Sequence, residues 1–246
     1  MSSPFPSVIA KYVQFSTPLE GDFCSPYPDN RNLITIGIGC LLDTTRGDGP
    51  PSFGLARGLP WVLPDCSTPT DAEVVRQLTA LKALNLRNYA ASSHAVTSAT
   101  TIRLTQAGVL ALATTRVNQD WTYLASRFPA IGTWPADAQL FALSISWAEG
   151  PAWDVGNPNL ARVLRLAPPD FLSAIMHAPD TAHPGQYLAA AADISTKGNP
   201  GIVPRNAQNE LALSNAQVVL DQKLPIDVLY WPRSPLEVAP ATTPGA

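Results

Sequence analysis

The sequence predicts an α+β fold, with a small β-hairpin or sheet near the N-terminus and a mainly helical lobe behind it. Apolar residues alternate with a strand-like period between Tyr27 and Leu42, whereas most of the chain after Thr105 shows helical spacing. The chain has 246 residues, of which 46% are hydrophobic. That length is enough for one large domain or two small ones that share a core.

The N-terminal part of the chain divides into a helix, two short strands and a loop. A helix is expected from about Ser7 to Leu19, because its apolar residues recur at helical spacing and Gly21 follows at the position of a helix C-terminus. From Tyr27 to Leu42 two short strands flank a polar turn. Residues 44–69 are rich in glycine and proline and predict a long loop.

The remainder is predicted to be almost continuously helical. Thr70 and Glu73 have the spacing of a capping box, so a helix is expected to run to about Asn88, followed by a connection over residues 90–101. Further helices are expected at 105–128, 135–149, from 158 onward, and at 168–176, 184–192 and 204–222. The Pro-rich chain from Pro232 is predicted to be disordered.

These elements predict a single domain over residues 1–225 and a Pro-rich tail over 226–246. Within that domain we expect a β lobe at about 20–69, and a helical lobe at about 70–225 that also includes the N-terminal helix.

Composition argues against several classes of protein. The net charge is −3, so no overall basic field exists to attract nucleic acid. No segment approaches the roughly 18 apolar residues that cross a bilayer, and the N-terminus lacks the pattern of a signal peptide. We therefore expect a protein made in the cytoplasm that contacts neither nucleic acid nor membrane.

The three cysteines have irregular spacing and predict neither a disulfide framework nor a zinc site. Reduced thiols are favoured, and a bridge between Cys24 and Cys40, the nearest pair, remains an alternative. The sequence indicates no metal and no cofactor.

Two carboxylates near the N-terminus are candidates for acid–base chemistry. Glu20 lies nine positions before Asp29, and Thr35 follows six positions later. Glu20 comes at the end of an apolar helix, where desolvation favours a protonated general acid, whereas the polar turn around Asp29 favours an ionised carboxylate. Hydrolysis of a glycosidic bond requires one carboxyl group of each kind. On spacing alone, the favoured interpretation of the pair is a helix-end residue and a turn residue without a catalytic role.

The full stretch LEGDFCSPYPDNRNLITIGIGCLLD, from Leu19 to Asp43, resembles the phage-type lysozymes of glycoside hydrolase family 24. By this resemblance Glu20 is the catalytic acid, Asp29 the second carboxylate and Thr35 the residue that positions water. Tyr27 is the aromatic residue before the hairpin. A weaker resemblance extends over residues 102–219, and the segment 44–101 is longer than its counterpart in small phage lysozymes.

The remaining candidate residues also come from this resemblance. Gly37 and Gly39 match the glycines of the TIGIG motif, and we expect them to let a polymer approach the backbone. Arg205 matches the arginine that approaches the catalytic glutamate, although a solvated arginine at a helix start is an alternative. One departure is Cys40, which stands where the family usually has histidine.

The resemblance implies a lysozyme-like fold and inverting hydrolysis of the β-1,4 bond between N-acetylmuramic acid and N-acetylglucosamine in peptidoglycan. The implied partner is a glycan strand, reached after holin release or after delivery by a secretion machine. In the second case we expect a protein inhibitor in the producing cell. The alternative is a catalytically silent protein that binds peptidoglycan or another partner on the same scaffold.

Other functional side chains have simpler interpretations. The tryptophans at 121, 134, 147 and 153 are expected in the core, whereas Trp61, in the predicted loop, is the better candidate for contact with a sugar. His94, His177 and His183 are scattered and have no recognisable Ser or Cys partner.

Overall fold

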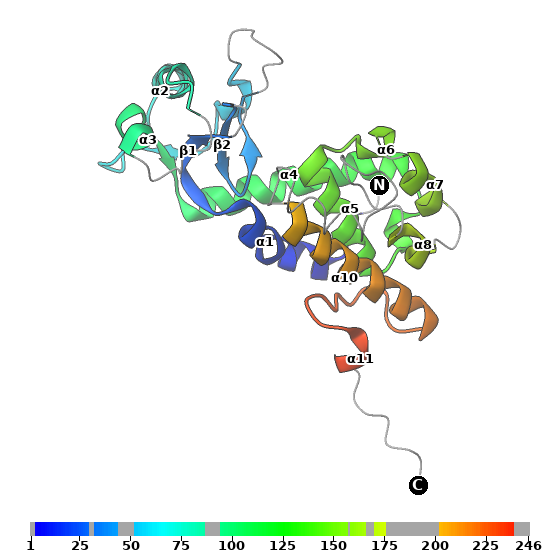
Figure 1. Ribbon diagram of the computed structural model, residues 1–246. Helices are drawn as coiled ribbons and strands as arrows, with labels where there is room; N and C mark the ends of the chain where they lie inside the picture. The colour runs from blue at the N-terminus through cyan, green and yellow to red at the C-terminus, as the bar shows by residue number, and fades with distance from the viewer. Residues whose placement is uncertain are drawn as a thin grey trace. The chain divides into compact units, whose positions relative to one another are not determined.

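The computed structural model describes residues 3–29, 32–43, 52–86, 94–156, 158–165, 170–175 and 202–238. The fold is α+β: helices dominate, and the strands are few and short (Figure 1). In chain order the elements are α1 (Pro6–Glu20), β1 (Phe23–Pro28), β2 (Ile34–Gly37), β3 (Cys40–Leu41), η1 (Gly54–Ala56), β4 (Trp61–Val62), α2 (Asp71–Ala83), α3 (His94–Ala99), β5 (Arg103–Leu104), α4 (Gln106–Arg127), η2 (Ile131–Thr133), α5 (Ala136–Glu149), α6 (Trp153–Gly156), α7 (Pro158–Arg165), α8 (Phe171–Ile175), α10 (Ile202–Asp221) and α11 (Pro235–Val238).

The chain forms two compact units. Residues 13–116 make one of them, the sheet unit, which contains every strand of the described chain and also α2 and α3. The other, the helical unit, consists of residues 1–12 and 117–246. The sequence assigned residues 70–116 to the helical lobe, but they cluster with the sheet, because α2 packs on β1 and β2, and β5 pairs with β4.

The sheet that follows α1 has three antiparallel strands in the order β1-β2-β3 (Figure 1). In this register Tyr27 pairs with Thr35, and Thr35 pairs with Leu41. Residues directly opposite one another project from the same face, so these three side chains share a face of the sheet. Every residue of β2 is buried, which makes this strand the core of the unit.

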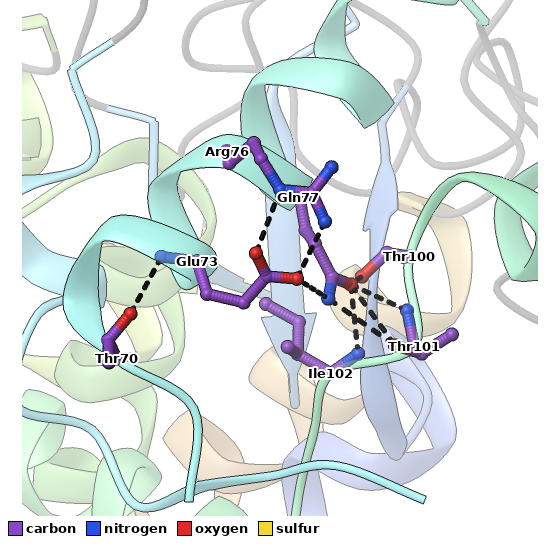
Figure 2. A network of polar contacts seen from close by, with 7 residues as sticks. All are labelled: Thr70, Glu73, Arg76, Gln77, Thr100, Thr101 and Ile102. Atoms are coloured by element: carbon purple, nitrogen blue, oxygen red, sulfur yellow. Dashed lines mark hydrogen bonds and ion pairs between the residues drawn. The ribbon is translucent and has the colours of Figure 1, made fainter.

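Thr70 caps α2, because its hydroxyl accepts a hydrogen bond from the Glu73 amide at 3.2 Å, whereas the Glu73 carboxylate binds Arg76 and Gln77 instead of closing the expected capping box. One turn later the carbonyl oxygen of the buried Gln77 side chain accepts from the amides of Thr101 and Ile102, at 2.7 and 3.2 Å. Figure 2 shows these contacts, which fasten α2 to the chain that leads into β5. The buried face of α2 therefore combines Val74, Leu78 and Leu81 with a glutamine.

The helical unit is built around α5. All residues from Ala136 to Trp147 are buried, and α10 packs along this helix and against α8 (Figure 1). The buried carboxylate of Asp137 accepts hydrogen bonds from the backbone amides of Tyr230 and Trp231, both at 3.0 Å. The segment after α10 is thus attached to the first turn of α5.

A second buried carboxylate joins three helices of the same unit. Oδ2 of Asp154, in α6, accepts from Arg127 of α4 at 2.7 Å and from Arg165 of α7 at 2.8 Å. The Arg165 guanidinium also lies over the Phe128 ring, 5.1 Å from its centroid, and that ring stacks on Trp153. These contacts fix the corner between α4 and α7.

Most predicted helices are confirmed, and several details differ. Helix α2 ends at Ala83 rather than near residue 88, and the connection predicted at 90–101 contains α3. Disorder from Pro232 is wrong for residues 232–238, which include α11 with its buried Pro235. The helix expected at 184–192 lies outside the described residues.

The predicted positions of the tryptophans are mostly confirmed. Trp121, Trp134, Trp147 and Trp153 are buried. Trp61 is buried as well, with 2% exposed, and its ring nitrogen donates to the Ala56 carbonyl at 2.7 Å. The expectation that Trp61 contacts a sugar is therefore wrong, because β4 turns this ring inward. Among the described helices, none combines the length and the apolar character needed to cross a bilayer.

Candidate active site

Glu20 is the last residue of α1, and its carboxylate lies against the turn between β2 and β3. A Cβ atom placed on Gly39 would lie 2.6 Å from Oε2 of Glu20, so only a glycine leaves room for the carboxylate there. The chain reaches β1 through Gly21, which has φ +82° and donates its amide to the Thr17 carbonyl at 2.8 Å. This left-handed residue ends the helix at Glu20 and turns the chain into the sheet.

Tyr27 lies near enough to both predicted catalytic carboxylates for their charges to act on its phenol. Burial raises the pKa of the Tyr27 phenol well above its usual range, and the negative charges of Glu20 and Asp29 raise it further. Its ring packs edge-on against Phe23, with 4.9 Å between centroids. The phenol therefore stays protonated and presents a hydrogen-bond donor within the field of both carboxylates.

Asp29 opens the loop between β1 and β2 and also organises it. Its Oδ1 accepts a hydrogen bond from the Leu33 amide at 2.7 Å, and its own amide donates to the Leu33 carbonyl at 2.8 Å. The Asn32 amide donates to the Asp29 carbonyl at 3.0 Å. Asp29 thus stabilises the turn, as the non-catalytic interpretation required. The same hydrogen bonds also orient its carboxylate.

Thr35 is buried, with 6% exposed, and lies opposite Tyr27 on the neighbouring strand. Its neighbours Ile34 and Ile36 project from the other face, as the alternating pattern predicted. Asp29 comes directly after β1, which ends at Pro28, so it lies at the end of the sheet from which the Tyr27–Thr35 pair is two residues away.

Both glycines of the TIGIG motif have left-handed backbones. Gly37 has φ +65° and Gly39 has φ +68°, so both adopt backbone conformations that side chains disfavour. A Cβ on Gly37 would lie 3.2 Å from the buried Val109 side chain. At Gly37 a Cβ atom would therefore meet the core, and at Gly39 it would meet Glu20, whereas the approach of a polymer to this backbone stays a prediction.

Arg205 belongs to the helical unit, where α10 carries it. It is buried, with 4% exposed, and its Nη1 donates to the Ser144 carbonyl and hydroxyl oxygens at 3.2 and 3.1 Å. The alternative of a solvated arginine is therefore wrong. Its approach to Glu20 stays a prediction.

Cys24, Cys40 and Cys66 are free thiols, as expected. Strand β2 separates β1, which carries Cys24, from β3, which carries the buried Cys40. Two strand spacings amount to about 10 Å, which exceeds the reach of a disulfide. Among the described residues, no three side chains of histidine, cysteine, aspartate or glutamate are grouped to hold a metal ion.

Sequence reasoning identified the polar turn that contains Asn32 but missed two residues beside it, Asp43 and Lys82. Lys82 is 50 positions from Asn32 in the chain, yet its Nζ donates to the Asn32 carbonyl at 2.7 Å. The same ammonium pairs with the buried Asp43 carboxylate at 2.6 Å. The left-handed Asn32, with φ +59°, is typical of a tight turn, but nothing local in the sequence indicates the lysine.

A comparison with known protein families gives no match to this chain, and a comparison with curated proteins also gives none.

Proposed function

We propose that this chain is a peptidoglycan hydrolase that cleaves the β-1,4 bond between N-acetylmuramic acid and N-acetylglucosamine. Glu20 is the general acid, Asp29 the general base, and Thr35 helps to position the attacking water. The observation that carries the proposal is that Tyr27 pairs with Thr35 across the sheet and lies near enough to Glu20 and Asp29 for both negative charges to raise the pKa of its phenol. The resemblance of Leu19–Asp43 to phage-type lysozymes supports the choice of substrate.

The proposed reaction inverts the anomeric carbon. Glu20 donates a proton to the leaving glycosidic oxygen, while Asp29 removes a proton from water that attacks the opposite face of the sugar. This route needs about 6.5–9.5 Å between the two carboxyl groups. The Tyr27 hydroxyl, kept protonated by its surroundings, offers a donor to the water or to the sugar.

The Glu20 carboxylate lies close to Gly39, and this close packing suits a general acid. A carboxyl group held in one place by packing loses less orientational freedom when it donates its proton to the leaving oxygen. The Leu33 amide does the same for Asp29, because it fixes one carboxylate oxygen in the turn. The Asp29 carboxylate is therefore oriented by a contact that does not depend on substrate, and the Glu20 carboxylate lies where only a glycine leaves room for it.

The first test compares Glu20→Gln with Glu237→Gln, which changes an exposed glutamate of α11 and serves as the control. Glu20→Gln keeps the size of the side chain but has no proton to donate, so release of reducing ends from purified sacculi should vanish with an unchanged thermal transition. The control variant should remain active. Activity that survives in Glu20→Gln would refute the assignment of the acid.

The structure of the Asp29 turn sharpens the test of the base. Asp29→Asn retains an Oδ1 that accepts the Leu33 amide, so it should fold normally and lose hydrolysis. Asp29→Ala removes both the base and the turn contact, so it should lose stability as well. If Asp29→Asn hydrolyses sacculi at the wild-type rate, the role of Asp29 is confined to the turn.

The turn contact of Asp29 also favours a second candidate, a protein that binds peptidoglycan without cleaving it. Sedimentation with sacculi distinguishes the two. Binding of the wild-type chain without release of reducing ends would support the silent scaffold and contradict the hydrolase.

A further inference from the structure

Helix α2 ends beside the loop that carries Asp29, and Lys82 in its last turn makes the contact. The Lys82 ammonium donates to the Asn32 carbonyl at 2.7 Å, and the Asn32 side-chain amide donates to the Lys82 carbonyl at 3.1 Å. The two residues therefore hold each other through both a backbone and a side-chain group. The Lys82 carbonyl is one of the last in α2, and it also accepts a hydrogen bond from the Asn85 amide at 3.1 Å.

Asn32 is part of the turn that orients Asp29. Its amide donates to the Asp29 carbonyl at 3.0 Å, its backbone is left-handed, and only 8% of it is exposed. The next residue, Leu33, supplies the amide that binds Oδ1 of Asp29. A movement of Asn32 would therefore move the amide that fixes the Asp29 carboxylate.

The sheet fixes Lys82 on its other side. Asp43 follows β3, its amide lies 3.3 Å from the Ile34 carbonyl, and its carboxylate is buried and 2.6 Å from the Lys82 ammonium. A buried carboxylate needs its partner, because an unpaired charge inside a protein is strongly destabilising. The ammonium is thus held in a fixed place between the sheet and the turn.

The helix that carries Lys82 is itself anchored at a distance from the turn. The Gln77 side chain accepts hydrogen bonds from the Thr101 and Ile102 amides, and Glu73 accepts from Gln77 at 2.7 Å (Figure 2). These contacts bind α2 to the chain before β5 and resist sliding of the helix along the sheet. The position of Lys82 is therefore set by two separate attachments of α2.

We propose that Lys82 is a positioning residue, whose ammonium holds the turn at Asn32 and thereby aims the Asp29 carboxylate. This inference rests on the proposed function, because it assigns Lys82 to the hydrolytic reaction. Lys82 does not touch the reacting atoms, and its effect passes through Asn32 and Leu33. A small displacement of a catalytic group can cost about a hundredfold in rate.

The test compares two variants that both contain Asp43→Asn. Asp43→Asn alone neutralises the buried carboxylate and leaves the ammonium bond to Asn32 in place. Lys82→Met with Asp43→Asn also removes the ammonium but keeps the aliphatic stem and the Lys82 carbonyl, and it strands no buried charge. The difference between these variants is therefore the Lys82 bond to Asn32.

Two quantities are measured on folded protein below the thermal transition. The first is hydrolysis of sacculi, separated into kcat and KM, and the second is hydrogen exchange of the Leu33 amide. Relative to Asp43→Asn, the double variant should lower kcat by about 10- to 100-fold with little change in KM. The Leu33 amide should exchange faster in the double variant.

Equal kcat and equal Leu33 exchange in the two variants would overturn the inference, as would a loss of kcat without faster exchange. A wild-type chain that hydrolyses no sacculi would refute the proposed function, and the catalytic part of this inference with it. In that case the Leu33 exchange alone would decide whether Lys82 holds the turn.

Discussion

At the scale of single residues, Gly39 is the position most directly coupled to the proposed general acid. Its backbone is left-handed, and its Cα faces the Glu20 carboxylate so closely that a Cβ atom would lie 2.6 Å from Oε2. Gly58 provides a natural comparison, because it has φ +77° and open space where its Cβ would stand. The two glycines share the same backbone strain and differ in what a side chain would displace.

Gly39→Ala should therefore harm activity more than stability. Both Gly39→Ala and Gly58→Ala should lose about 1–2 kcal/mol of unfolding free energy, the cost of a left-handed alanine. Only Gly39→Ala should lower kcat, by roughly 10- to 100-fold, because its methyl group displaces Glu20. Urea denaturation and sacculus hydrolysis measure the two effects, and an equal loss of kcat in both variants would contradict the coupling.

The residue scale also shows what the sequence could and could not predict about the site. Glu20, Tyr27 and Asp29 lie within ten positions of one another, so a local pattern was enough to group them. Lys82 lies 50 positions from Asn32, and its contact depends on how α2 packs on the sheet. The periodicity of apolar residues in a sequence does not indicate a contact between residues so far apart in the chain.

At the scale of elements, α2 contains a carboxyl group, Glu73, whose contribution to stability should depend on pH. The pKa of Glu73 falls from 4.5 to about 2, first because Arg76 donates hydrogen bonds to its carboxylate and second because Gln77 does. A carboxyl group with a lowered folded-state pKa stabilises the fold above its unfolded pKa, and that contribution is lost as the pH falls toward the folded value. The relevant window therefore lies between about pH 4.5 and 2.

Glu73→Gln should flatten the decline of stability in this window. Wild-type protein should lose stability as the pH falls through it, whereas the variant has no carboxyl group to protonate at this position. Arg76→Gln should show an intermediate slope, because it removes the first cause of the lowered pKa. Urea midpoints measured at intervals across the window test this, and parallel curves for wild type and Glu73→Gln would contradict it.

The element predictions failed where packing outweighs local preference. The segment that contains α3 consists mostly of small and polar residues, so its sequence indicated a connection. The structure has a short helix there, and the Val96 side chain of this helix is fully buried. Gln77 interrupts the apolar stripe of α2, and its burial depends on amides 24 and 25 positions away. The long helices α4 and α5 were predictable because two signals indicate the same element. Their apolar residues recur at helical spacing, and the residues at which they begin are typical of helix starts.

At the scale of the whole molecule, residues 222–238, which follow α10, are part of the fold rather than a tail. Trp231 is 9% exposed, and its ring nitrogen donates to the Gln208 side chain at 2.7 Å. The amides of Tyr230 and Trp231 satisfy the Asp137 carboxylate, whose pKa is raised by burial and lowered in part by these bonds. The proline content of this segment suggested disorder. The sequence alone does not show that the buried Asp137 carboxylate needs hydrogen-bond donors from this segment.

A chain that ends at residue 225 should therefore be destabilised by at least about 3 kcal/mol, since it loses a buried tryptophan and leaves a buried carboxylate without two donors. Leu236→Ala in the full chain is the matched control, because Leu236 is 62% exposed and its loss should change stability by less than about 0.5 kcal/mol. Thermal and urea denaturation measure both. A shortened chain as stable as the full one would show that this segment contributes nothing to the fold.

The bond that the protein cleaves tests the central claim most directly. Purified sacculi are digested with the wild-type chain and with Glu20→Gln, and the soluble fragments are identified by mass spectrometry after reduction. The account predicts fragments that end in reducing N-acetylmuramic acid, from the wild-type chain and not from the variant. Fragments that end in reducing N-acetylglucosamine or in anhydro-N-acetylmuramic acid, cleavage in the peptide, or no fragments at all would contradict it.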